Sequence, residues 1–120
     1  MVGRRNDINK LREAIQKNNI EWRKHTLIRL AERNISQDVV LEVILEGEVI
    51  ENYPKDRPFF SCLMFKVVEG KPFHVMVSLD EQNQKGYIIT TYEPTLDNFE
   101  SEIFQSRLFT WSDKTTPVTI

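Results

Sequence analysis

The hydrophobic pattern of this 120-residue chain changes its period at Gly47. Before Gly47, apolar residues recur every three or four positions, as they do on one face of a helix; after it, they alternate as in strands. Helices followed by closely spaced strands predict an α+β domain. We expect one domain over residues 1–120, with N-terminal helices packed on a four-stranded antiparallel sheet and a short C-terminal helix.

Three helices are expected before the change of period. The first covers about residues 5–18 and the second about residues 22–33. The expected core stripe of the second helix consists of Leu27, Leu30 and Ala31. Asn34 can adopt the left-handed conformation that ends a helix, and Ile35 follows it as an apolar contact. Ser36 is then the predicted N-cap of the third helix.

Four strands are expected after the change of period. They cover Glu48 to Tyr53, Phe59 to Val68, Phe73 to Asp80, and Tyr87 to Tyr92. The third strand alternates cleanly, so Phe73 and Val75 belong to one face and His74 and Met76 to the other. Helical spacing of the apolar residues near 96–104 predicts the C-terminal helix, and the tail from residue 109 is expected to be loose.

Composition and charge limit the classes of protein to which this chain can belong. The chain is 40% hydrophobic with a net charge of −2, which argues against disorder. It has no apolar run of the roughly 20 residues that a membrane helix needs, and its first residues do not resemble a signal peptide. We expect a cytoplasmic protein without membrane association. The oligomeric state is left open by the sequence.

The small net charge conceals an uneven distribution along the chain. Residues 1–36 hold nine Lys and Arg against four Asp and Glu, a net charge of +5. Residues 37–120 hold seven against fourteen, a net charge of −7. A molecule charged in this way can meet an anionic partner on one face only.

The most suggestive side chains lie on the second expected helix. His25, Arg29 and Arg33 are spaced four residues apart, so they share one stripe of the helix. Arginine binds phosphate oxygens through forked donors, and histidine exchanges a proton near neutral pH. The row therefore suits a phosphodiester. The alternative is a solvated helix face whose charges pair with neighbouring carboxylates.

Other candidates lie on the expected sheet. His74 shares a face with Met76 and can either line a groove or be a half-buried histidine bonded to the next strand. Tyr87 and Tyr92 begin and end the last strand, and a phenol there can protonate a leaving group or simply pack at the sheet edge. Glu93 can act as a base or neutralise the basic helix.

Several chemistries have no support in the sequence. The four glycines form no phosphate-binding loop, and two histidines with one cysteine form no metal-ligand cluster. Cys62 lies in the most apolar strand, where a thiol is normally inert packing. We expect no disulfide, metal or cofactor.

Four segments in register resemble a widespread prokaryotic domain family of unknown function. They are His-Thr-Leu-Ile-Arg-Leu-Ala-Glu-Arg-Asn-Ile-Ser (25–36), Gly-Glu-Val-Ile-Glu-Asn-Tyr-Pro (47–54), Lys-Pro-Phe-His-Val (71–75) and Tyr-Ile-Ile-Thr-Thr-Tyr-Glu-Pro (87–94). They are similar to the family's H-x3-R-x3-R-[GN]-I-[ST], GEVIE-YP, RPLHVV and YIITAYEP patterns. Asn34 stands where the family usually has Gly, and both residues tolerate the left-handed cap. The resemblance covers about residues 22–104.

The order of elements is also similar to compact ribonuclease toxins of the RelE and BrnT kind, a likeness at the level of fold. This likeness implies a metal-independent endoribonuclease in which His25 or His74 takes the 2′-hydroxyl proton. Arg29 and Arg33 would stabilise the phosphate charge, and Tyr92 would help the leaving oxygen. The implied partners are RNA or the ribosome and an antitoxin-like protein. The alternative is a non-catalytic module that binds protein or nucleic acid, with structural motif residues.

Overall fold

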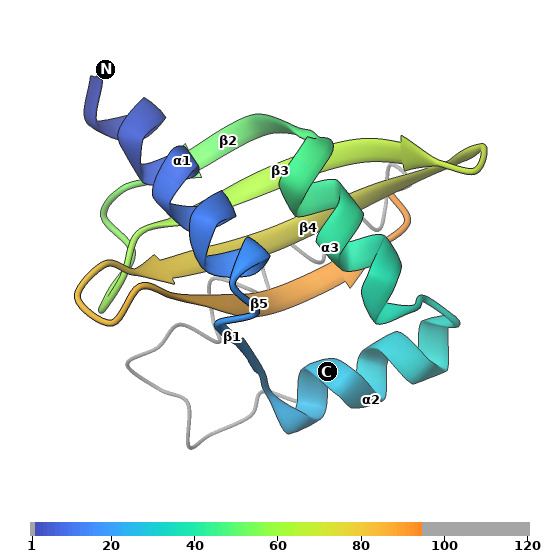
Figure 1. Ribbon diagram of the computed structural model, residues 1–120. Helices are drawn as coiled ribbons and strands as arrows, with labels where there is room; N and C mark the ends of the chain where they lie inside the picture. The colour runs from blue at the N-terminus through green and yellow to red at the C-terminus, as the bar shows by residue number, and fades with distance from the viewer. Residues whose placement is uncertain (1, 95–120) are drawn as a thin grey trace.

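The computed structural model describes residues 2–94, with side chains from residue 8 onward, and it confirms the α+β class (Figure 1). The elements are α1 (Val2–Gln16), β1 (Ile20–Trp22), α2 (Lys24–Arg33), α3 (Gln37–Glu46), β2 (Glu48–Tyr53), β3 (Ser61–Val68), β4 (Lys71–Asp80) and β5 (Lys85–Tyr92). The C-terminal helix expected near 96–104 and the tail from residue 109 lie outside the described residues.

The described strands form a five-stranded sheet in the order β1-β5-β4-β3-β2. Strands β2 to β5 make the expected antiparallel meander. The prediction of four strands is wrong, because β1 adds a parallel strand beside β5, with Ile20 opposite Gly86 and Trp22 opposite Ile88. β1 is only three residues long, which is too short to show alternation, so the pattern assigned Trp22 to the next helix.

Helices α1 and α3 cross one face of the sheet (Figure 1). There the apolar side of β4 joins residues of both helices in one buried cluster, as the predicted alternation requires. The cluster includes Phe73, Val75, Val77 and Leu79 of β4, Leu11 and Ile15 of α1, and Val40, Val43 and Ile44 of α3. The opposite side of β4, with His74, Met76 and Ser78, is buried as well. β4 is therefore a central strand covered on both faces.

The turn from α3 into β2 requires glycine at position 47. A Cβ atom there would meet the backbone carbonyl oxygens of Val43 and Phe65, and a backbone cannot move aside as a flexible side chain can. Arg12 of α1 donates hydrogen bonds to the same turn, from Nε to the carbonyl oxygen of Ile44 at 2.9 Å and from its terminal nitrogen to that of Gly47 at 2.6 Å. The glycine at the change of period therefore permits close contact between α3 and β3.

The caps between α2 and α3 agree with the sequence. Asn34 ends α2 in the left-handed conformation, with φ 58° and ψ 43°. The amide of Ile35 then donates to the carbonyl oxygen of Leu30 at 2.9 Å, which satisfies a carbonyl at the end of the helix. The hydroxyl of Ser36 accepts a hydrogen bond from the amide of Val39 at 3.2 Å, so the predicted N-cap of α3 is confirmed.

α2 packs on β5 through a different stripe from the predicted one. Thr26 and Leu30 are buried, and the hydroxyl of Thr26 donates to the carbonyl oxygen of Ile88 at 3.3 Å. Leu27 and Ala31 are exposed, so two of the three predicted core positions are wrong. α2 is covered on one side, so it buries only a narrow stripe of residues. Thr26 occupies one position of that stripe because its hydroxyl bonds to the backbone of β5.

Candidate functional site

A broad, shallow hollow of about 730 Å³ lies where β1, the start of α2 and the start of β5 meet. It is lined by Glu21, Trp22, Arg23, Lys24, His25, Ile28 and Tyr87. The acidic member of this set, Glu21, lies 3.6 Å from the ammonium group of Lys85. The hollow therefore presents mainly positive charge and aromatic surface.

The N-terminus of α2 adds to that positive charge. Arg23 is the N-cap residue, and it lines the hollow together with Lys24 and His25 of the first turn. The Arg23 side chain makes no capping hydrogen bond. The positive end of the helix dipole is thus not neutralised by an N-cap side chain, and helix N-termini of this kind bind phosphate groups.

Tyr87 forms an aromatic wall of the hollow. The ring of Phe59, from the β2–β3 connection, stacks on Tyr87 with centroids 5.4 Å apart and an angle of 17° between the planes. The guanidinium carbon of Arg23 lies 5.8 Å from the centroid of the same ring. Partial burial lowers the pKa of Arg23, while Glu21 and Tyr87 raise it. A guanidinium stays charged at neutral pH, so the wall holds a permanent cation in place.

His25 is the titratable base of the hollow. Partial burial lowers the pKa of its imidazole, and the positive charges of Arg23 and Arg29 lower it further. Because the ordinary value is 6.5, His25 is neutral at pH 7 and can accept a proton. A neutral base near two permanent cations is suited to deprotonating a hydroxyl group next to a phosphate.

The three residues of the predicted row, His25, Arg29 and Arg33, do not act together in the structure. His25 and Arg29 lie near enough for the charge of the arginine to act on the imidazole. Arg33, at the last position of α2, donates to the carbonyl oxygen of Thr91 at 2.8 Å. Arg33 therefore ties the end of α2 to the backbone of β5.

His74 and Tyr92 form a separate, buried pair. Nδ1 of His74 lies 3.2 Å from the hydroxyl of Tyr92, and the two rings meet edge to face at 5.3 Å. Burial lowers the pKa of His74. Tyr92 stands five residues after Tyr87 on β5, about 16 Å along an extended strand. The pair is therefore not part of the hollow, and His25 and His74 do not form one site.

The sequence pattern identified some residues of the hollow and missed others. His25 and Tyr87 were candidates, but Arg23 and Lys24 were not. Both fell inside the predicted helix over 22–33, since the short strand before them was not recognised. A run of three adjacent basic residues at the start of a helix is the signal that could have found them.

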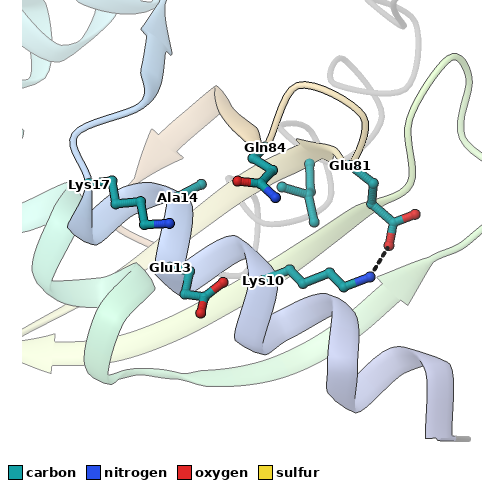
Figure 2. A pocket seen from close by; sticks show the side chains of 7 residues that line it. Lys10, Glu13, Ala14, Lys17, Glu81 and Gln84 are labelled. Atoms are coloured by element: carbon teal, nitrogen blue, oxygen red, sulfur yellow. Dashed lines mark ion pairs between the residues drawn. The ribbon is translucent and has the colours of Figure 1, made fainter.

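A second pocket, of about 130 Å³, lies between α1 and the turn from β4 to β5 (Figure 2). Its lining residues are Lys10, Glu13, Ala14, Lys17, Leu79, Glu81 and Gln84. The ammonium group of Lys10 points toward Glu81, 3.7 Å away. Two lysines and two glutamates balance in charge, and no imidazole or phenol lines this pocket. The hollow beside α2 is therefore the stronger candidate site.

Two features are absent from the part of the chain that the structure describes. Over residues 2–94, no three or more His, Cys, Asp and Glu side chains are grouped so that they could hold a metal ion. None of the helices in this part of the chain has both the length and the apolar character of a membrane-spanning helix. Cys62 is buried in β3.

A family model for a domain of unknown function, DUF4258, matches residues 22–93. The match runs from the last residue of β1 to just beyond β5, so it includes the whole hollow except Glu21 and leaves out α1. No curated protein and no solved structure matches the chain. The expected similarity to RelE and BrnT toxins is therefore not shown and remains a prediction.

Proposed function

We propose that this chain, which belongs to the DUF4258 family of domains of unknown function, binds RNA in the hollow beside α2 and cleaves it without a metal ion. The observation that carries the proposal is the position of His25. Its imidazole lies on the first turn of a helix that has no side-chain cap, and its pKa is lowered by partial burial and by the charges of Arg23 and Arg29. The same hollow thus offers phosphate-binding groups and a base.

The proposed reaction is an internal transesterification. His25 takes the proton from a 2′-hydroxyl group as the 2′-oxygen forms a bond to phosphorus. The bond from phosphorus to the 5′-oxygen breaks, and the leaving oxygen takes a proton from the Tyr87 phenol or from water. The products are a 2′,3′-cyclic phosphate and a 5′-hydroxyl end. Arg23 and Arg29 stabilise the charge that develops on the phosphate oxygens.

This scheme keeps His25 and Arg29 from the residues singled out in the sequence and changes the others. Arg23 takes the place of Arg33, and Tyr87 takes the place of Tyr92, because Arg23 and Tyr87 line the same hollow as His25. RNA, free or on the ribosome, is the proposed substrate. A toxin-like role in the cytoplasm, silenced by an antitoxin-like partner, belongs to the same proposal and rests on the resemblance alone.

A second candidate function is RNA binding without cleavage. The breadth of the hollow favours it, because a shallow surface holds a strand without enclosing the reacting phosphate. The burial of His74 and Tyr92 favours it as well, since it leaves one imidazole at the site. The two functions share the phosphate-binding residues and differ in whether His25 acts as a base.

The test is to incubate purified protein with labelled single-stranded RNA and with ribosomes, in EDTA, and to measure both binding and cleavage. His25→Gln is expected to bind RNA and to lose cleavage by about 10²-fold or more. His74→Gln, which changes the buried histidine, is the matched control and should cleave as the parent does. Thermal denaturation checks that each variant is folded.

Each outcome decides between the two functions. Cleavage that persists in His25→Gln contradicts the assignment of the base. Binding without cleavage by the parent selects the second function, and absence of both rejects RNA as the ligand. Because the pKa of His25 is lowered from 6.5, cleavage should persist at pH 6.5 and fall only at more acidic pH.

A further inference from the structure

Two large apolar side chains lie next to each other on the outer surface of α2. Leu27 is 39% exposed and Ile28 is 47% exposed, and Ala31, one turn further, is exposed too. Two of the four exposed large hydrophobic residues in the described part of the chain thus occur on one short helix. Adjacent apolar side chains of this kind indicate a contact surface more often than a single exposed residue does.

Helix geometry places Ile28 at the middle of this outer surface. Successive residues turn by about 100°, so Ile28 points nearly opposite to Thr26 and Leu30, the two residues buried toward β5. Figure 1 shows α2 beyond the sheet edge formed by β1 and β5, whereas α1 and α3 cross the face of the sheet. Among the described residues, Ile28 is therefore on the side of α2 that is not packed on the sheet.

The charges around Ile28 are arranged so that the surface complements itself. Lys24 lies four residues before Ile28 and Glu32 four residues after it, both exposed on the same side of the helix. Neither takes part in an ion pair with another described residue. If two copies of α2 cross antiparallel at Ile28, the Lys24 of each copy meets the Glu32 of the other. A parallel pair would instead bring like charges together.

We propose that this protein forms a symmetric dimer in which α2 packs antiparallel on α2 of a second copy, with Ile28 at the twofold axis. Leu27 and Ala31 flank the axis, and two Lys24–Glu32 pairs close the ends. An interface related by a twofold axis uses the same patch on both subunits, and this patch meets that requirement. Ile28 and Lys24 also line the hollow, so a dimer and a bound RNA would share these two side chains, and association is therefore measured without RNA.

The dimer is expected to be weak. α2 has ten residues, so it is only about 15 Å long, and a contact between two such helices falls at the small end of specific interfaces. Small interfaces of this size give concentration-dependent association rather than an obligate dimer. The same crossing places His25 of one copy opposite Ala31 of the other, so both hollows lie close to the twofold axis.

The test is sedimentation velocity of the full chain from about 5 to about 500 µM, a range chosen for a weak dimer. The parent is expected to associate as concentration rises. Ile28→Glu should remain monomeric over the whole range. Val67→Glu is the matched control, since Val67 is 50% exposed on β3, and it should associate as the parent does.

A charge-exchange series tests the orientation of the helices. Lys24→Glu and Glu32→Lys should each weaken association by about tenfold, since each creates two like-charge contacts in a symmetric pair. The double variant with both changes should recover the parent's association. A parent that stays monomeric throughout overturns the proposal. A double variant that fails to recover, or a loss of association in Val67→Glu, contradicts the antiparallel α2 interface. Circular dichroism confirms that each variant is folded.

Discussion

Helices α2 and α3 have the same length and opposite characters. Each has ten residues, and they follow one another with a three-residue connection. The hydroxyl of Ser36 caps α3, which buries Val40, Val43 and Ile44 under the sheet. α2 has no side-chain cap, buries only Thr26 and Leu30, and leaves Leu27 and Ile28 at the surface.

We infer that the two helices have different roles: α3 stabilises the fold, and α2 provides a surface. α3 contributes apolar surface to the core, which is the main source of folding free energy. α2 is attached by a threonine hydroxyl and the guanidinium of Arg33, both bonded to carbonyl oxygens of β5. Its N-terminus, which has no side-chain cap, and its exposed apolar outer face are the surfaces proposed to contact ligands and partners. Three pairs of substitutions test this difference in roles.

The largest expected effect comes from truncating the same residue type in each helix. Ile44→Ala in α3 should lower the free energy of unfolding by about 2–5 kcal/mol, because Ile44 is fully buried and leaves a cavity. Ile28→Ala in α2 should change it by no more than about 0.5 kcal/mol. Urea denaturation at low protein concentration measures both values. Similar losses in the two variants would contradict the difference in roles.

A smaller effect separates the two arginines of α2. Arg33→Met should cost about 1–3 kcal/mol of stability, because it leaves the buried carbonyl group of Thr91 without its donor, and should not change RNA affinity. Arg29→Met should leave stability within about 0.5 kcal/mol and weaken RNA binding several-fold. Fluorescence anisotropy with labelled RNA, together with urea denaturation, measures the pair. The reverse pattern would move the binding surface to the other end of α2.

The smallest expected effect concerns the two N-caps. Ser36→Ala should cost about 1 kcal/mol, because an amide of the first turn of α3 loses its acceptor. Arg23→Ser supplies a cap to α2, which raises stability, and removes the contact of Arg23 with Tyr87, which lowers it. The two contributions to the free energy of unfolding are of similar size. Its stability should therefore stay within about 0.5 kcal/mol of the parent. RNA affinity should fall, and a variant that binds as the parent does would contradict the role of Arg23.

Much of the fold followed from local patterns in the sequence. The change of period at Gly47, the caps at Asn34 and Ser36, and the alternation of β4 were all predicted and found. The strand β1 was missed because three residues carry no periodic signal. The core stripe of α2 was wrong at Leu27 and Ala31, because the helix buries a stripe that depends on where β5 lies.

The candidate site was predicted only in part, because some of its features are local and others depend on contacts between distant residues. Spacing put His25, Arg29 and Arg33 on one helix stripe, which is a local property. It did not show that Arg33 bonds to the backbone of Thr91, 58 residues away in the sequence. Nor did it show that Tyr87, near the start of β5, lines the hollow, or that Tyr92, at the end of the same strand, packs on His74.

The sequence by itself determined the class of fold, the helix caps, the glycine at the turn and the concentration of positive charge in the first 36 residues. These depend on the conformational preferences and periodicity of neighbouring residues. Only the tertiary structure decided that β1 joins β5, that the start of α2 opens into a hollow, and that Ile28 faces outward. These depend on which distant segments come into contact, and neither spacing nor charge along the chain specifies such contacts.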